Sequence, residues 1–427
     1  MTVTQTLMSL GPTIDMIWVG KLGGIAVAAV GVSGVVVMLA MSVMFGLTAG
    51  MLALISRAIG AKDIPMANRV AQQAVVVSAV YAVLVALVGH FFAEKIVLLI
   101  TSDPEIVSLG TMYLRIEFIG GATMIFRIMM DVIMQASGDA MNPMWIATVY
   151  RFLHIALCPF LVFGWWIFPE LGVRGAAYTG IIAQSLGVIL GLRVLFSARS
   201  RLRLSFGGFH FDMGIIWRII RISFPASVSG VQRGLSQFIL QIFIASFGAA
   251  TLAAHVITQR LEMFILMPAM SFGMGAGVLV GQNLGATKPE RAERSAWLAV
   301  GVGEAFVIAV SLAMFIWTGP IIRLFNSDPA LDAAATQFIH IAVAGWVFMG
   351  FMFALMSSLQ GAGDTVPVMV INITTTWVIA ILLAYLLPRY TDWGVISIRW
   401  AMSASIIVAA LANIIYFRTG RWKTRRV

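Results

Sequence analysis

A single acid inside the first apolar run is the residue whose chemistry stands out most. Asp15 follows Pro12, and proline lacks the backbone N–H that would close a helical turn beside it. An ionised side chain in hydrocarbon costs at least about 2.5–3.5 kcal/mol on insertion scales, so such a residue has either a function or a partner. Asp15 is therefore the first candidate for binding and releasing a proton. The alternative is a charge-pairing or helix-end role near Lys21.

Two opposite charges lie within the fourth apolar run. Arg127 and Asp131 are four residues apart, so a helix places them on one face, where they can neutralise each other. A structural ion pair is the favoured interpretation, and a gate or a neighbour of the proton site is the alternative. Both residues are therefore candidates for proton or cation coupling.

The seventh apolar run carries a polar residue at every fourth position: Ser229, Arg233, Gln237 and Gln241. Such a stripe must avoid lipid, and we favour a substrate cavity over hydrogen bonds between helices as the reason for it. Glu262 joins these cavity candidates, with Arg260 near enough in sequence to offset its charge. Glu304 is a further acid of the carboxy-terminal half.

The elements that hold these residues must be membrane helices. Of 427 residues, 60% are hydrophobic and 11% are charged, compared with about 25% charged in soluble domains, which excludes a water-soluble globular enzyme. The only cysteine, Cys158, excludes an internal disulfide and a thiolate cluster, and the five histidines show no metal-ligand spacing. Because the sequence also has no phosphate-binding loop of the Walker type, we expect no enzymatic activity, no ATP-driven pumping and no cofactor.

Twelve apolar runs are long enough to cross a hydrocarbon layer of about 30 Å. They lie near residues 2–20, 25–55, 68–92, 107–135, 143–167, 173–196, 222–246, 250–282, 294–317, 333–359, 366–388 and 394–417. We therefore predict an all-α integral membrane protein with twelve transmembrane helices.

Lysine and arginine are unevenly divided between the two ends of these runs. Seventeen lie on the side of the termini and six on the opposite side. Because cytoplasmic loops carry the excess of positive charge, both termini are predicted to be cytoplasmic. This placement explains the net charge of +10, so we expect the lipid bilayer as a partner and no nucleic acid.

A shift of 225 residues aligns four patches of the sequence with each other. The pairs are Gly23 with Gly248, Gly60-Ala61 with Gly285-Ala286, Ser102-Asp103-Pro104 with Ser327-Asp328-Pro329, and Gln135, Gly138 and Asp139 with Gln360, Gly363 and Asp364. The repeat predicts two pseudo-symmetric six-helix bundles, residues 1–197 and 213–427, joined by a cytoplasmic linker at 198–212. Since six is even, both bundles insert in the same orientation and enclose a central cavity. Alternating access is favoured over a static pore, because no repeated ring of polar residues suits a selectivity filter.

Several segments resemble motifs of the multidrug and toxic compound extrusion (MATE) family. They are Asp15-Met-Ile-Trp-Val-Gly20, Ile55-Ser-Arg-Ala-Ile-Gly-Ala61, Gln135-Ala-Ser-Gly-Asp139, Gly281-Gln-Asn-Leu-Gly-Ala286 with Arg291-Ala292, and Leu359-Gln-Gly-Ala-Gly-Asp364. The resemblance covers essentially the whole chain, and the DinF-like branch is the expected subgroup. It implies a secondary exporter of bulky, often cationic and aromatic compounds, driven by inward movement of protons or sodium.

The resemblance also bears on the fifth helix. Many family members there have asparagine, three residues, aspartate and then proline, and they place an acid at the position of Asp15. This chain has His154 and Cys158 at the two polar positions. We expect His154 to partner Asp15, because an imidazole can share or relay a proton with a carboxylate. Loss of the aspartate disfavours sodium. The alternatives are a core histidine bonded to backbone and a small buried apolar group at Cys158.

Taken together, these features predict a monomeric antiporter of the bacterial cytoplasmic membrane. It would exchange lipophilic cations and aromatic drugs for protons, with sodium less favoured. A flippase for a lipid-linked or anionic precursor is the alternative, suggested by Arg127, Arg233 and Arg260. A channel or membrane scaffold is the third class.

Overall fold

The computed structural model describes residues 11, 14–197, 201–323 and 329–425 of the chain. In the amino-terminal part, residues 14–19 are helical and lead into a 3-10 turn, Gly20–Leu22. The long helices that follow are α2 (Gly24–Gly60), α3 (Ile64–Leu98), α4 (Pro104–Ala136), α5 (Met141–Phe163), α6 (Val173–Phe196) and α7 (Met213–Ala245).

The carboxy-terminal part is also helical. Its elements are α8 (Ala249–Gly285), α9 (Pro289–Ile316), α10 (Thr318–Arg323), α11 (Pro329–Trp346), α12 (Met349–Gly361), α13 (Thr365–Thr374), the π-helical turn η2 (Thr375–Ile381), α14 (Leu382–Tyr390), α15 (Val395–Arg418) and the 3-10 turn η3 (Arg421–Thr424).

The predicted all-α membrane class is confirmed. Among the described residues, eight helices are long and apolar enough to cross a membrane, or nine if the pair α11 and α12, bent by 42°, is one span. The helices α4 and α7 are equally long at 33 residues each, but both carry charged side chains within them. Most of the first predicted run, 2–20, lies outside the described residues.

The described chain divides into two compact units, the first ending at Ile220 and the second following it. This division lies inside α7, and the linker at 198–212 stays a prediction. The approach to α7 belongs to the first unit because α3 binds it: the side-chain amide of Gln72 donates to Ser205 O at 2.5 Å.

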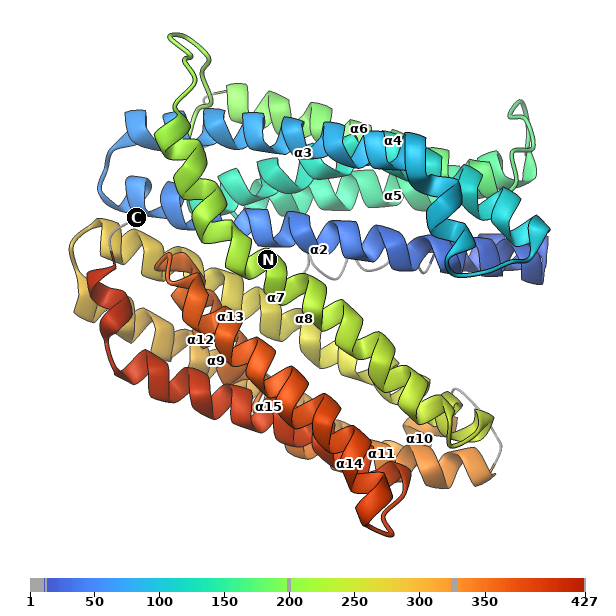
Figure 1. The fold of residues 1–427 in the computed structure, drawn as a ribbon. Helices are drawn as coiled ribbons and strands as arrows, with labels where there is room; N and C mark the ends of the chain where they lie inside the picture. The colour runs from blue at the N-terminus through green and yellow to red at the C-terminus, as the bar shows by residue number, and fades with distance from the viewer. Residues whose placement is uncertain (1–10, 12–13, 198–200, 324–328, 426–427) are drawn as a thin grey trace. The chain divides into compact units, whose positions relative to one another are not determined.

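Each unit is a bundle of long helices that pack lengthwise (Figure 1). In the first unit α4 packs against α2, α3 and α6, and α5 packs against α6. In the second unit α8 packs against α9, α11 and α12, and α15 packs against α11, α12 and α14. The approach of α12 to α8 requires a glycine, since a Cβ at Gly361 would lie 2.0 Å from Gly277 O. Small residues at such contacts are typical of membrane bundles.

The turns aligned by the 225-residue shift have the same geometry in both units. Gly23 and Gly248 precede α2 and α8 with φ of 114° and 110°, and both helices have 37 residues. Gly138 and Gly363 follow α4 and α12 with φ of 90° and 78°, a region that favours glycine. The counterpart of Asp103 at position 328 lies outside the described residues. The repeated sequence therefore specifies a repeated backbone.

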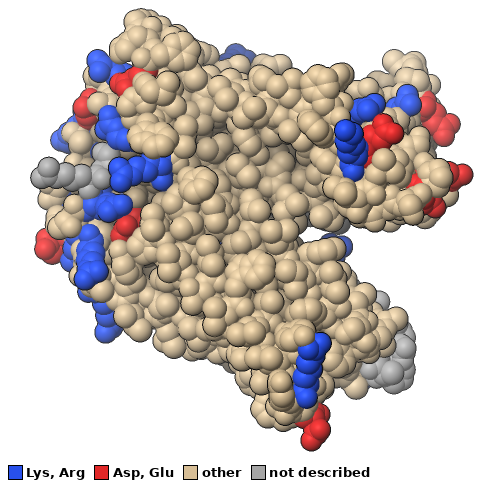
Figure 2. Space-filling view, viewed as in Figure 1, with Lys and Arg blue, Asp and Glu red and all other residues tan. Residues whose placement is uncertain are grey.

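Lysine and arginine gather at the end of each unit where its first two long helices turn (Figure 2). The residues at or near the α2–α3 turn are Arg57, Lys62 and Arg69, and those at or near the α8–α9 turn are Lys288, Arg291 and Arg294. Each bundle thus has one strongly basic end, which agrees with the uneven distribution in the sequence.

Candidate functional site

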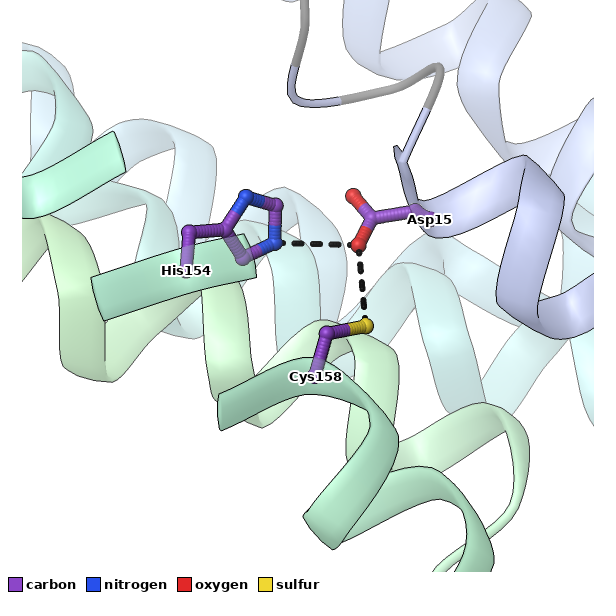
Figure 3. A group of neighbouring side chains, drawn as sticks. All are labelled: Asp15, His154 and Cys158. Carbon is purple, nitrogen blue, oxygen red and sulfur yellow. Dashed lines mark hydrogen bonds and ion pairs between the residues drawn. The ribbon is translucent and has the colours of Figure 1, made fainter. Parts of the chain in front are cut away.

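Three side chains from two distant segments meet in the first unit (Figure 3). Asp15 lies on the helical segment 14–19, and His154 and Cys158 lie four residues apart on one face of α5. His154 Nε2 is 3.0 Å from Asp15 Oδ1, and Cys158 Sγ is 3.7 Å from the same oxygen. The Asp15 side chain is 15% exposed and that of His154 is 3% exposed. The structure thus brings together three residues that the sequence singled out, and their role in coupling stays a prediction.

Arg151 extends this chain of hydrogen bonds behind the histidine. Its Nη1 lies 2.7 Å from His154 Nδ1. Guanidinium nitrogens only donate, so Nδ1 must accept and the ring hydrogen must be on Nε2. His154 is therefore a neutral imidazole whose Nε2–H donates to the Asp15 carboxylate. Sequence reasoning missed Arg151, although its spacing of three residues from His154 on a helix indicates contact.

A second acid lies near Asp15. Glu117 of α4 is close enough for the two carboxylates to interact electrostatically, and Tyr113, one turn earlier, hydrogen-bonds to Glu117. Glu117 also lies against α6, with Oε1 3.9 Å from the position of a Cβ at Gly180. Sequence reasoning missed it, although an acid in the middle of the run 107–135 meets the criterion that identified Asp15.

The donor atoms of Asp15, His154 and Cys158 lie within 4.8 Å of one another, and such a set of oxygen, nitrogen and sulfur ligands suits zinc. The hydrogen bonding of His154 does not suit zinc. A metal on His154 Nε2 needs the ring hydrogen on Nδ1, where ligating histidines donate to an acceptor. Here Nδ1 faces an N–H of Arg151, so we assign no metal to this site.

Arg127 and Asp131 form a buried ion pair within α4. The Nε of Arg127 also donates to Gln184 of α6, and its guanidinium lies 5.0 Å from the centre of the Tyr150 ring on α5. Arg151 lies against the same ring at 5.3 Å. The pair therefore contributes to packing between three helices, as the structural interpretation expects. A role in coupling stays a prediction.

Glu262 of α8 has partners that the sequence did not connect with it. Trp346 of α11 donates to its carboxylate, and Arg399 of α15 is the cation beside it. Arg260, expected to offset this acid, is exposed. Arg399 Nη1 also lies 2.9 Å from His255 Nδ1, so the hydrogen of this buried imidazole is also on Nε2. Within the described parts of the chain, that Nε2 has no partner.

The polar stripe of α7 has mixed surroundings. Ser229 is buried, Arg233 is partly buried with its guanidinium 5.9 Å from the centre of the Phe353 ring, and Gln237 and Gln241 are exposed. A cavity role for these residues and for Glu262 stays a prediction.

Glu304 binds a helix end. Its Oε2 accepts a hydrogen bond from Phe351 N at 3.0 Å, in the first turn of α12, where backbone N–H groups lack helical partners and favour a negative charge. Gly350 permits this contact, since a Cβ there would lie 2.3 Å from Glu304 Oε2. Glu304 is therefore explained by capping.

Comparison with known proteins gives a family match in both units. The MatE family model matches residues 1–160 and 225–386. The two matches agree with the internal repeat.

Curated relatives cover the full chain at low identity. A "Probable multidrug resistance protein YoeA" of Bacillus subtilis is 24% identical, over 100% of this chain and 92% of that protein. A "Probable multidrug resistance protein NorM" of Thermotoga maritima is 25% identical, over 99% and 91%. A "FAD transporter" of Shewanella oneidensis is 22% identical, over 93% and 88%.

Solved structures share the fold. An "outward-facing conformation of a multidrug resistance MATE family transporter of the MOP superfamily" superposes with a TM-score of 0.92 at 22% identity, covering 98% of this chain and 93% of that one. A MOP superfamily transporter from Pyrococcus furiosus superposes with a TM-score of 0.90 at the same identity. The predicted twelve-helix fold with two six-helix lobes is confirmed.

Proposed function

The chain belongs to the MATE family of transporters, and from that premise we propose that it exports small molecules across the membrane in exchange for protons. It is a multi-pass membrane transporter and not an enzyme. The observation that supports proton coupling most directly is the hydrogen-bonded Asp15, with an imidazole N–H and a thiol directed at one carboxylate oxygen. A carboxylate held in this way can accept a proton from one side of the membrane and release it to the other.

Protons are favoured over sodium because of the polarity of these hydrogen bonds. A sodium ion in a transporter is coordinated by oxygen atoms, including backbone carbonyls. At Asp15 the neighbouring His154 Nε2–H donates to the carboxylate and occupies a position where a cation would need a lone pair. Protonation of Asp15 removes its charge without requiring further ligands.

The substrates proposed are bulky lipophilic cations and aromatic drugs, since two of the relatives above are named as multidrug resistance proteins. Transport would proceed by alternating access of a cavity between the two lobes, with the protein acting as a monomer. The basic ends of both units support a location in a bacterial cytoplasmic membrane with both termini cytoplasmic.

The test uses purified protein in liposomes loaded with a fluorescent cationic dye. An imposed pH gradient should drive dye movement by the wild type, and an equal sodium gradient should not. Asp15→Asn should abolish pH-driven movement, because the amide that replaces the carboxylate cannot take up and release a proton. The matched control is Asp392→Asn, an identical change at an exposed turn. Unchanged pH-driven movement in Asp15→Asn would refute the proposal.

Anionic substrates, including a lipid-linked precursor, are the second candidate. Arg233 supports them, because no carboxylate pairs with it within the described residues, and one relative is named as a transporter of FAD, an anionic aromatic compound. Arg127 does not support them, since Asp131 neutralises it. Competition of a cationic and an anionic dye for transport would separate the two classes.

A further inference from the structure

Arg151 is buried between His154 and Gly11. It is 5% exposed, its Nη1 is 2.7 Å from His154 Nδ1, and its guanidinium packs directly on Gly11. A Cβ at Gly11 would lie 2.4 Å from Arg151 Nη1 and 2.9 Å from Nη2. Gly11, four residues before Asp15 in the sequence, therefore covers the arginine behind His154.

We propose that Arg151 is a positioning residue of the proton site: it holds His154 with its hydrogen on Nε2, so that the histidine donates to Asp15 and does not itself take the transported proton. The inference rests on the proposed function only in identifying the Asp15 site as the coupling site. Hydrogen-bond polarity imposes this arrangement. A second proton on His154 Nδ1 would direct N–H against the N–H of Arg151, and both groups would then carry positive charge.

The other charged and titratable groups near His154 do not hold its hydrogen on Nε2 in the way that Arg151 does. On α5 itself Tyr150 packs against Arg151, and Cys158 lies on the Asp15 side. The groups on the other elements are Asp15 on the segment 14–19, Tyr113, Glu117 and Arg127 on α4, and Thr179 on α6, which bonds Cys158. Neither acid among them contacts His154 Nδ1, which is bound to Arg151.

Two consequences distinguish this arrangement from a histidine relay. An arriving proton neutralises Asp15 while His154 keeps one hydrogen, so the pair of Asp15 and His154 carries a single exchangeable proton. In addition, His154 Nε2 stays closed to soft metal ions, although Asp15 and Cys158 supply suitable neighbouring donors. Removing Arg151 should change both properties.

The primary test is nitrogen-15 NMR of the full-length protein, labelled at histidine and reconstituted in lipid nanodiscs at pH 6, with the His154 signals assigned by their loss in His154→Gln. The wild type should show one protonated nitrogen, Nε2, and one unprotonated nitrogen, Nδ1. Arg151→Met should show His154 with both nitrogens protonated in a substantial fraction of molecules. A doubly protonated His154, or hydrogen on Nδ1, in the wild type would overturn the inference.

Gly11→Ala provides a second variant that keeps the arginine. Its added Cβ displaces the guanidinium, so the spectrum of His154 should move towards that of Arg151→Met. Identical His154 spectra in the wild type and both variants would also overturn the inference. If Arg151→Met does not fold, Gly11→Ala alone decides.

Metal binding gives an independent readout. Cobalt(II), a spectroscopic substitute for zinc, should give thiolate absorption with Arg151→Met and not with the wild type, and Arg151→Met combined with Cys158→Ala should abolish it. Thiolate absorption of equal strength in the wild type would contradict the proposed role of Arg151. None of these measurements depends on transport, so a failure of proton-driven export would refute the proposed function without affecting them.

Discussion

Each unit buries an arginine hydrogen-bonded to a histidine. The two pairs differ in what lies opposite the histidine Nε2–H. In the first unit Arg151 binds His154 Nδ1 at 2.7 Å, and in the second Arg399 binds His255 Nδ1 at 2.9 Å. Both imidazoles therefore present Nε2–H on the opposite edge. In the first unit that hydrogen meets the carboxylate of Asp15, whereas in the second no partner for it lies in the described parts of the chain. Only the pair in the first unit therefore has the acid that the proposed proton site requires.

The internal repeat does not explain this likeness. A shift of 225 residues places His255 on Val30 and Asp15 on Leu240, so the two pairs occupy unrelated positions. What the two units share is the backbone of their turns, including Gly23 and its counterpart. The duplicated scaffold fixes helix lengths and turns, while the chemistry of each interior is independent.

The largest effect predicted by this comparison is on coupling. His154→Ala removes the N–H donor to Asp15 and should lower pH-driven dye movement at least about tenfold. His255→Ala should leave the dependence on the pH gradient intact, because no acid among the described residues binds that imidazole. Dye movement in liposomes measures both. Equal loss of coupling in the two variants would show that the second unit also carries protons.

The next effect is on stability. Arg399 is 2% exposed and is the cation beside the half-buried Glu262 carboxylate, so Arg399→Met should lower the free energy of unfolding by about 3 kcal/mol by leaving this acid without its cation. Equilibrium unfolding in mixed detergent micelles measures this. Arg399→Met combined with Glu262→Gln should regain most of the loss. If the single change costs less than about 1 kcal/mol, the second unit does not depend on this pair for stability.

A double-mutant cycle addresses Arg127 and Asp131. Each single change, Arg127→Met or Asp131→Asn, leaves one buried charge without its opposite charge, whereas the double change leaves neither charge behind. We expect a coupling energy of about 2 kcal/mol in unfolding and normal proton-driven export by the double variant. Export that fails in a folded double variant would place this pair on the proton pathway and favour the gate that the sequence left open.

The sequence predicted the scaffold well because membrane helices and repeated turns have strong local signals. Long apolar runs predict the membrane helices, and the matched glycines at positions 138 and 363 predict the repeated turns. The predicted linker at 198–212 stays a prediction, but side chains of α3, including Gln72, bind the segment before α7. No local pattern reports such a contact.

The site was predictable only in part. Asp15, His154 and Cys158 were found because charge in an apolar run and family resemblance identify residues one at a time. Arg399 was not connected with Glu262, since the two are more than 130 residues apart in sequence and meet only because α11 and α12 pack against both α8 and α15. The hydrogen-bond polarity that explains the site depends on distances, which the sequence does not contain.

The smallest effect is predicted for Cys158. Its Sγ lies 3.7 Å from Asp15 Oδ1, and a thiol is a weak donor, so Cys158→Ala leaves the carboxylate with its stronger partner, the imidazole N–H. Proton-driven export should change by less than about twofold, because a loss below roughly 0.4 kcal/mol corresponds to that factor. The variant also becomes free of cysteine. If export falls as far as in His154→Ala, both donors are needed to hold Asp15, and the arginine–histidine pair alone does not define the difference between the two units.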